Sequence, residues 1–221
     1  YSGDADLSRV RSVIAEMPAE SDHSLVMKST VPSGTGETIR RELPGIAYVS
    51  CPEFLKEGSA VEDFLHPDRV VVGAAPEHAE AGDIVSALYE PLGGEIVRTD
   101  VSSAEMIKLA SNAYLATRIS SINEIANVCE EVGADVGEVA RGMGLDSRIG
   151  PHFLRPGIGY GGSCFPKDVS ALKLLAGNSG YHFQLLNSVI EVNELQKRRV
   201  VSKLSKHLGT LVGKRVALLG L

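Results

Sequence analysis

The first hundred residues alternate between two kinds of segment, and this alternation limits most strongly how the chain can fold. Short β-branched segments bounded by glycine, proline or polar residues predict strands at residues 24–30, 45–50, 69–74 and 94–100. Helical spacing is found at residues 6–17, 36–43 and 76–92. Strands that alternate with helices are typical of the α/β class with a parallel, doubly wound sheet. No G-x-G-x-x-G fingerprint begins this sheet, so we expect only part of a Rossmann-like domain.

A long helix follows these segments. Ser102 or Ser103 can cap its start and Gly133 can end it, so the pattern predicts one helix of about thirty residues. Its apolar residues recur at helical spacing and form one stripe, which consists of Leu115, Ile119, Ile122, Ala126 and Cys129. Further helices are predicted at residues 168–180 and 185–208.

The start of this stripe contains polar residues. Lys108 lies about 20° from Leu115 around the helix axis, and Asn112 follows one turn after Lys108. Burial of an ammonium group without a partner costs several kcal/mol. Two interpretations follow: either the helix end emerges into solvent at Lys108, or Lys108 and Asn112 point into an occupied cleft.

The C-terminal residues 213–221, "GKRVALLGL", resemble a basic entry into a buried strand that begins another α/β domain. We therefore expect three parts: residues 1–100 in the partial sheet, residues 101–209 in a helical domain, and residues 210–221 in the first strand of a further domain. The chain is expected to be the middle of a longer protein.

Composition excludes several classes of function. The net charge of −6 disfavours a nucleic-acid surface. The sequence contains no run of 18 apolar residues, which is the length that could span a membrane. The N-terminal residues lack the apolar core of a signal peptide. The three cysteines are odd in number and lack C-x-x-C spacing, which disfavours disulfides and structural zinc and favours a cytoplasmic location. The six histidines are scattered, so no metal site is expected.

One cysteine has unusual neighbours. The segment "GIGYGGSCFPKD" places Cys164 between clustered glycines and the pair Lys167 and Asp168. Glycine clusters often allow a ligand to approach the backbone, and a nearby cation favours the reactive thiolate. The alternative is an ordinary loop cysteine.

Two further segments carry candidate site residues. "KSTVP" ends the first predicted strand, where α/β folds bind ligands, although a plain turn would also explain it. Glu53 and Glu57 are four residues apart, so their carboxylates would share a face if Pro52 began a helical turn. A solvated acidic face is the alternative.

Together these segments resemble the UDP-glucose/GDP-mannose dehydrogenase family, and the UDP-glucose 6-dehydrogenases in particular. The resemblance covers essentially the whole chain. It depends on five motifs, "KSTVPSGTGE", "PEFLKEGSAVEDFLHPDRVVVG", "AEMIKLASNAYLATRISSINEIA", "DSRIG" and "GYGGSCFPKD". It implies the end of an NAD-binding domain, a central helical dimerisation domain, and the first strand of a UDP-sugar-binding domain. The family's N-terminal G-x-G-x-x-G half and most of its C-terminal domain have no counterpart here.

The resemblance implies a four-electron oxidation of the sugar C6 alcohol to a carboxylate, with two NAD⁺ as oxidants. The residues implied for proton transfer and oxyanion stabilisation are Lys108, Asn112 and Asp168. Cys164 is implied to attack the aldehyde and to form a thiohemiacetal and then a thioester. Glu53 is implied as the general base for thioester hydrolysis, with Thr30 ordering the water.

The resemblance also implies ligand contacts. UDP-glucose contacts are expected at Glu53, Phe54, Leu55, Lys56, Glu57, Lys108, Asn112, Arg148, Phe153, Leu154, Arg155, Gly157, Tyr160 and Gly161. NAD contacts are expected at Ser29, Thr30, Val31, Glu57, Cys164 and Lys167. The long helix would form a homodimer interface, and Arg148 would reach the partner's site.

Two alternatives accompany this interpretation. GDP-mannose and UDP-N-acetyl-hexosamine 6-dehydrogenases share the fold and the thiol chemistry, although "GGSCFPKD" and "EGSAVEDFLHPDR" favour the UDP-glucose branch. A non-catalytic dimerising core is the other alternative, but it would not need the set of Cys164, Lys108, Asn112 and Asp168.

Overall fold

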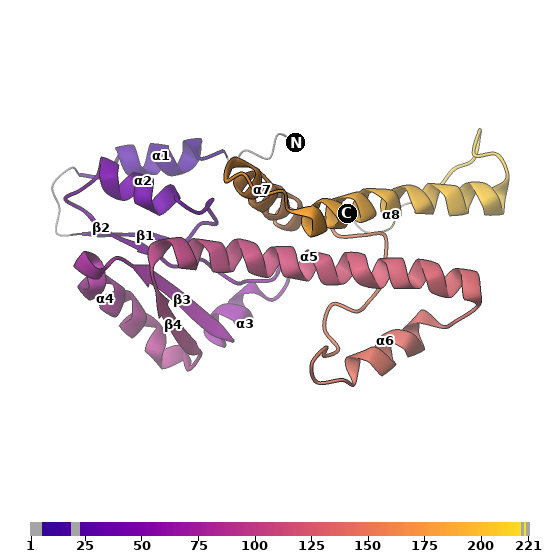
Figure 1. Ribbon diagram of the computed structural model, residues 1–221, viewed down its shortest axis with the longest axis horizontal. Coiled ribbons are helices and arrows are strands. Elements are labelled where there is room, and N and C mark those ends of the chain that lie inside the picture. The colour runs from indigo at the N-terminus through magenta and orange to yellow at the C-terminus, as the bar shows by residue number, and fades with distance from the viewer. Residues whose placement is uncertain (1–5, 19–22, 218, 220–221) are drawn as a thin grey trace. The chain divides into compact units, whose positions relative to one another are not determined.

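A computed structural model describes residues 6–18, 23–217 and 219 of the chain (Figure 1). The chain forms two compact units. The sheet unit consists of Tyr1–Ala113 and Lys167–His182, and the helical unit consists of Tyr114–Pro166 and Phe183–Leu221. We describe each unit by itself. The predicted boundaries at residues 100 and 209 remain a prediction.

The sheet unit contains four strands, β1 (Ser24–Met27), β2 (Ala47–Ser50), β3 (Arg69–Ala74) and β4 (Glu95–Thr99). All four lie within the segments predicted as strands. Its helices are α1 (Ser8–Ala15), α2 (Thr35–Glu42), α3 (Ala60–Leu65), α4 (Ala79–Tyr89), the short 3₁₀ turns η1 (Pro76–His78) and η2 (Glu90–Leu92), the start of α5 (Val101–Val132), and nearly all of α7 (Phe165–Asn178).

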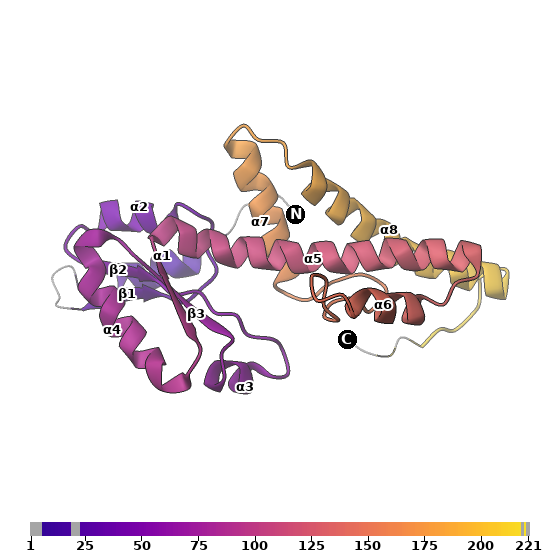
Figure 2. The same ribbon diagram turned by 60° about the horizontal axis from the view of Figure 1, so that its bottom comes forward.

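Helices α1 and α2 lie over one face of the sheet and α4 lies over the other (Figure 1, Figure 2), and a hydrophobic cluster packs on each side. On one face, Tyr48 packs with residues of α1 and α2, including Ile14 and Ile39. On the other face, the next residue of the strand, Val49, packs with Val85 of α4. Successive residues of a strand point to opposite faces, so the alternation along β2 determines which helix each side chain contacts.

The strand order is β1-β2-β3-β4. The pairs β1–β2 and β3–β4 are parallel, which confirms the α/β class with mostly parallel pairing. The pair β2–β3 is antiparallel, so the expectation of an entirely parallel sheet is wrong at this position. A parallel neighbour needs a crossover that packs on the sheet. The connection from β2 to β3 contains only the six-residue helix α3, which has no buried residue.

The helical unit contains the rest of α5, together with α6 (Val136–Gly144) and α8 (Gln184–Leu208). Ile122, Ala126 and Cys129 of the predicted stripe are buried, while Leu115 and Ile119 are half-buried. Ser120 Oγ donates a hydrogen bond to the carbonyl oxygen of Val189 at 3.1 Å and thereby links α5 to α8.

The ends of these helices follow local chemistry. Gly133 takes a φ of 74° directly after α5, as predicted from its place in the sequence. Helix α6 was not predicted separately, although Asp135 caps it by accepting a hydrogen bond from the Gly137 amide at 2.7 Å. The strand expected at residues 213–221 is not formed by residues 213–217 and 219, and the remaining three residues lie outside those described.

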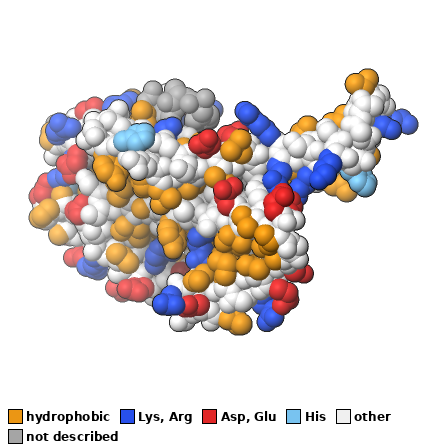
Figure 3. All heavy atoms as spheres, turned by 45° about the vertical axis from the view of Figure 1, so that its right-hand side comes forward, with side chains coloured by type: hydrophobic (Ala, Val, Ile, Leu, Met, Phe, Trp, Pro, Cys, Tyr) orange, Lys and Arg blue, Asp and Glu red, His pale blue; other side chains and the backbone are white. Residues whose placement is uncertain are grey.

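Figure 3 shows acidic and basic side chains interspersed with hydrophobic ones on the face that it draws. Within the described part of the chain, no helix has the length and apolar character needed to cross a membrane.

Candidate active site

Three polar side chains are buried together in the sheet unit. Lys108 and Asn112 of α5 are each 8% exposed, and Asp168 of α7 is 2% exposed. Asn112 Nδ2 donates a hydrogen bond to Asp168 Oδ2 at 2.6 Å, and Lys167 Nζ lies 3.2 Å from Asp168 Oδ1. The interpretation that the helix end emerges into solvent at Lys108 is therefore wrong.

The ammonium group of Lys108 lies 5.1 Å from the centre of the Phe54 ring. The Arg69 guanidinium lies 4.0 Å from the centre of the same ring. Both distances are within the range of cation–π attraction. Phe54 thus connects the segment after β2 to the lysine of α5, which brings two of the motifs in the sequence together.

The segment that carries Glu53 is irregular rather than helical. Residues 51–56 form no helix, so the condition that Pro52 begins a helical turn is not met. The backbone amide of Lys56 instead donates to Asp63 Oδ2 at 2.8 Å, and Lys56 Nζ pairs with Asp63 Oδ1 at 3.0 Å. Glu53 and Glu57 consequently do not share a helical face.

Lys28, the last residue before the Ser29–Val31 segment, has three polar neighbours. Its Nζ donates to Tyr89 Oη at 2.7 Å and to Cys51 Sγ at 3.5 Å, and lies 3.8 Å from Glu53 Oε1. Partial burial opposes the charge on Lys28, but the contacts with Tyr89 and Cys51 outweigh it and raise its pKa above the ordinary value. Lys28 therefore holds Glu53 near the end of β1.

Glu105 was not singled out in the sequence, yet it holds the loop after β1. Its Oε2 accepts a hydrogen bond from the Gly34 amide at 2.7 Å, and its Oε1 accepts one from the Gly36 amide at 2.8 Å. Burial outweighs these two hydrogen bonds and raises the pKa of Glu105 to about 7. Its position in the sequence does not distinguish it from a solvated acid on a helix, because its partners lie 71 and 69 residues away.

The segment after β1 and the amides at the start of α2 show which part of NAD the described residues can bind. Ser29 is exposed and Thr30 is half-buried just beyond the carboxyl end of β1, so both side chains can meet a ligand there. Val31 is 3% exposed and belongs to the hydrophobic core, which leaves only its backbone for such a contact. The amides at the start of α2 already bind the Glu105 carboxylate. This region therefore suits one end of a dinucleotide but not its pyrophosphate, which needs such amides.

The helical unit carries the other predicted substrate contacts. The backbone amide and carbonyl groups of Gly157 and Tyr160 are hydrogen-bonded by side chains of α5 and α8. Phe153 adopts a φ of 60°, which is uncommon for a residue other than glycine. Leu154 is buried, whereas Arg155 and Gly161 are exposed. Arg148 is exposed and pairs with Asp146 at 2.6 Å.

Cys164 is exposed and directly precedes the first residue of α7. Its sulfur lies 3.6 Å from Ser163 Oγ. Asp168 lies in the first turn of α7, so the buried carboxylate follows the exposed thiol by four residues in the sequence. Cys51 and Cys129 are buried by contrast.

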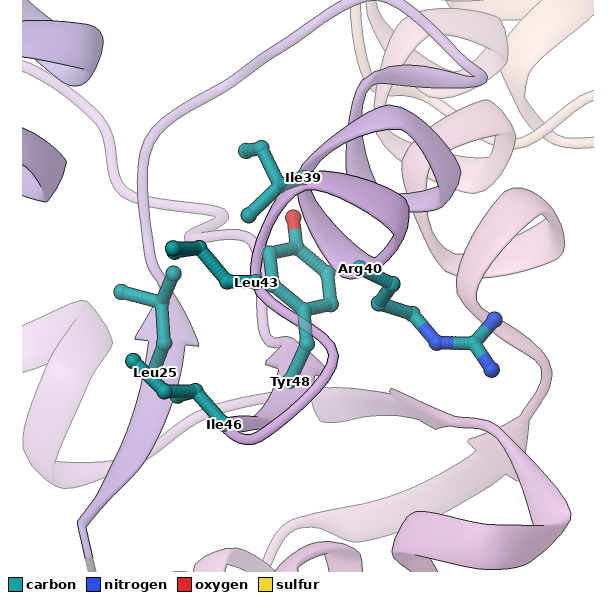
Figure 4. A pocket seen from close by; sticks show the side chains of 6 residues that line it. All are labelled: Leu25, Ile39, Arg40, Leu43, Ile46 and Tyr48. Carbon is teal, nitrogen blue, oxygen red and sulfur yellow. The ribbon is translucent and has the colours of Figure 1, made fainter. Parts of the chain in front are cut away.

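One hollow in the sheet unit lies apart from these residues. Figure 4 shows Tyr48 pointing from β2 toward Ile39 and Leu43 at the end of α2. The hollow is lined by Leu25, Ile39, Arg40, Leu43, Ile46 and Tyr48. None of these residues is a predicted site residue, and five of the six side chains are largely apolar, so the hollow offers no reactive group.

The sequence matches two domain models of one family. Residues 1–93 match the NAD binding domain of the UDP-glucose/GDP-mannose dehydrogenase family, and residues 102–195 match its central domain. The chain belongs to the UDP-glucose/GDP-mannose dehydrogenase family. The family resemblance found in the motifs is thereby confirmed.

Individual relatives agree with this assignment. The chain is 52% identical over 207 residues to UDP-glucose 6-dehydrogenase YwqF of Bacillus subtilis (strain 168), covering 90% of this chain and 47% of that protein. It is 45% identical over 230 residues to UDP-glucose 6-dehydrogenase of Rickettsia bellii (strain RML369-C), covering 100% of this chain and 52% of that protein. The chain thus spans about half the length of the relatives that it matches.

Solved structures of similar fold include two dehydrogenases. The structure of a UDP-glucose dehydrogenase from Pyrobaculum islandicum matches with a TM-score of 0.85 and 36% identity, covering 95% of this chain and 51% of that one. That of a UDP-D-ManNAc dehydrogenase from Pyrococcus horikoshii matches with a TM-score of 0.82 and 26% identity, with the same coverage.

Proposed function

We propose that the whole protein oxidises UDP-glucose to UDP-glucuronate in a four-electron reaction that uses two NAD⁺. The observation that carries the proposal is the buried set of Lys108, Asn112 and Asp168, which a non-catalytic core has no need to retain. The names of the relatives with 45–52% identity support UDP-glucose as the substrate. NAD⁺ would supply the oxidising power by accepting a hydride in each oxidation.

The first oxidation needs a group that accepts the proton of the C6 hydroxyl. Lys108, buried and close to an aromatic ring, would accept this proton as a neutral amine, and the ammonium so formed would stabilise the oxyanion. Asn112 would orient the sugar oxygen, since its amide is already held by Asp168 at 2.6 Å. Asp168 would hold a water beside this amide.

The second oxidation retains the aldehyde on the protein. The thiolate of Cys164 adds to the aldehyde carbon to give a thiohemiacetal, whose oxidation gives a thioester. Glu53, half-exposed near Lys28, would remove a proton from the water that hydrolyses the thioester. Thr30 would order that water. Release of the carboxylate regenerates the thiol.

The binding roles are part of the same proposal. UDP-glucose would be held by residues 53–57, by Arg148 and by the backbone between Phe153 and Gly161, and NAD by residues 29–31, Glu57, Cys164 and Lys167. A homodimer formed through α5 would let Arg148 complete the partner's site. The reaction would take place in the cytoplasm.

GDP-mannose and UDP-N-acetyl-hexosamines are the competing substrates. The structural match to a UDP-D-ManNAc dehydrogenase favours testing the second class, but its 26% identity is lower than the 36% of the UDP-glucose dehydrogenase. Production of NADH by the whole protein with each nucleotide sugar decides between them. UDP-glucose should give two NADH per sugar, and turnover of another sugar in its place would contradict the proposal.

Substitution of the thiol tests the mechanism. Cys164→Ser should abolish complete turnover because the hydroxyl is a far weaker nucleophile. Cys129→Ala, which removes a buried thiol of α5, is the matched control and should keep its activity with a small loss of stability. Two NADH per sugar from Cys164→Ser at the wild-type rate would remove Cys164 from the mechanism.

A further inference from the structure

The segment from Gly157 to Gly161 has no helix or strand to satisfy its backbone hydrogen bonds. Unpaired backbone groups that are shielded from water are costly, so such a segment needs other partners. At its first residue, the Gly157 amide donates to Asn123 Oδ1 at 2.8 Å, and the Gly157 carbonyl accepts from Gln196 Nε2 at 2.8 Å. Amide side chains of α5 and α8 therefore replace a neighbouring strand here.

Near the other end of the segment, a single side chain does the same for Tyr160. Asn193 of α8 accepts a hydrogen bond from the Tyr160 amide at 2.7 Å and donates one to the Tyr160 carbonyl at 3.1 Å. Asn193 is 3% exposed, so water cannot readily replace either bond. A primary amide of this length offers both an acceptor and a donor with this spacing.

Gly159 allows this approach. Its φ is 107°, a conformation that favours glycine. A Cβ atom at this position would lie 2.5 Å from Asn193 Oδ1, which is too close for any real contact. The Asn193 side chain thus occupies space that only a glycine at position 159 leaves open.

We propose that Asn193 is a positioning residue that holds residues 157–161 in the conformation that binds the nucleotide sugar. This inference rests on the proposed function, which assigns Gly157, Tyr160 and Gly161 to the substrate. Asn193 would act through the backbone of Tyr160 rather than through contact with the reacting atoms. Its removal should therefore weaken substrate binding more than it slows chemistry.

Asn193→Asp is the most informative variant. It keeps the size and one acceptor oxygen but replaces the donor to the Tyr160 carbonyl by a second oxygen. At neutral pH the KM for UDP-glucose should rise about tenfold or more, as expected when buried polar groups lose their partner. The KM for NAD should change less than about twofold. Burial raises the pKa of an introduced carboxyl group, so acidification should restore a donor and recover much of the loss.

Ser120→Ala is the matched control. It removes the buried hydrogen bond from Ser120 Oγ to the Val189 carbonyl, which joins the same two helices without touching the segment. This variant should lower the melting temperature but leave the KM for UDP-glucose as in the wild type. An equal rise of that KM in both variants would show that Asn193 acts only through general stability and would overturn the proposal.

Hydrogen–deuterium exchange provides a second measurement that does not depend on activity. In the whole protein, Asn193→Asp should speed exchange of the peptide that contains residues 157–161 by about tenfold, while Ser120→Ala should not. Exchange equal to that of the wild type would overturn the proposal. If the wild type fails to oxidise UDP-glucose, the proposed function is wrong, and the exchange rates still decide whether Asn193 holds the segment.

Discussion

Lys108 lies where burial makes a positive charge costly. Lys108→Ala should lower kcat by on the order of a hundredfold or more, since it removes a group that acts mainly in the transition state. The KM for NAD should change little. Steady-state kinetics of the whole protein provide the test, with Lys173→Ala of the exposed face of α7 as the control. A kcat equal to that of the wild type would leave Lys108 with a structural role only.

Glu105 should make stability depend on pH. Its pKa of about 7 in the fold exceeds the ordinary value of 4.5, so the folded state binds the proton more tightly than the unfolded state. The contribution of Glu105 to the free energy of unfolding is complete below about pH 4.5 and is lost as the pH rises through about 7. Between these pH values the loss is about 1.4 kcal/mol per pH unit. Urea unfolding at a series of pH values should show that the free energy of unfolding falls with rising pH in the wild type more than in Glu105→Gln. Parallel curves of the free energy of unfolding against pH for the two proteins would contradict this role of Glu105.

The difference between Lys108 and Glu105 shows what periodicity can find. Lys108 and Asn112 continue an apolar stripe, so a polar residue there stands out from the sequence alone. Glu105 lies near the same stripe, but its partners Gly34 and Gly36 are 71 and 69 residues away. An acid on a helix is most often solvated, and only the fold brings these amides to it.

The contact between α5 and the sheet depends on a glycine. A Cβ atom on Gly73 of β3 would lie 2.5 Å from the Ala104 Cβ and 2.6 Å from the Asp100 carbonyl oxygen. Gly73→Ala should therefore lower the free energy of unfolding by about 1–3 kcal/mol, the usual cost of overpacking. Gly45→Ala is the control, because its added Cβ would meet nothing within 4 Å. Denaturant unfolding measures both, and equal stabilities would contradict the close contact.

At the scale of elements, local patterns predicted most of the secondary structure. The four strands and the end of α5 at Gly133 follow from residue type and spacing. The antiparallel β2–β3 pair could not be predicted, because pairing direction depends on how the intervening connection packs. The irregular segment after Pro52 could not be predicted either, because the Lys56 amide at its end donates to the carboxylate of Asp63, seven residues later.

At the scale of the whole molecule, we expect the 221-residue chain by itself to bind NAD weakly. The loop after β1 has no G-x-G-x-x-G spacing, and the first amides of α2 are occupied by Glu105. Loss of the pyrophosphate contacts should leave a millimolar Kd, roughly 4 kcal/mol weaker than micromolar binding. Calorimetric titration of this chain, with the whole protein as the control, measures the difference. A micromolar Kd for the chain would contradict the expectation.

The different exposure of the three cysteines has a practical consequence. Cys164 is exposed, whereas Cys51 and Cys129 are buried on opposite sides of the division between the two units. Brief alkylation should therefore modify one thiol in the native protein and all three in denaturant, as counted by intact mass. At intermediate denaturant concentrations, digestion after alkylation would show which of the two buried thiols becomes reactive first. The native thiols would thus report the unfolding of each unit separately, without any introduced label.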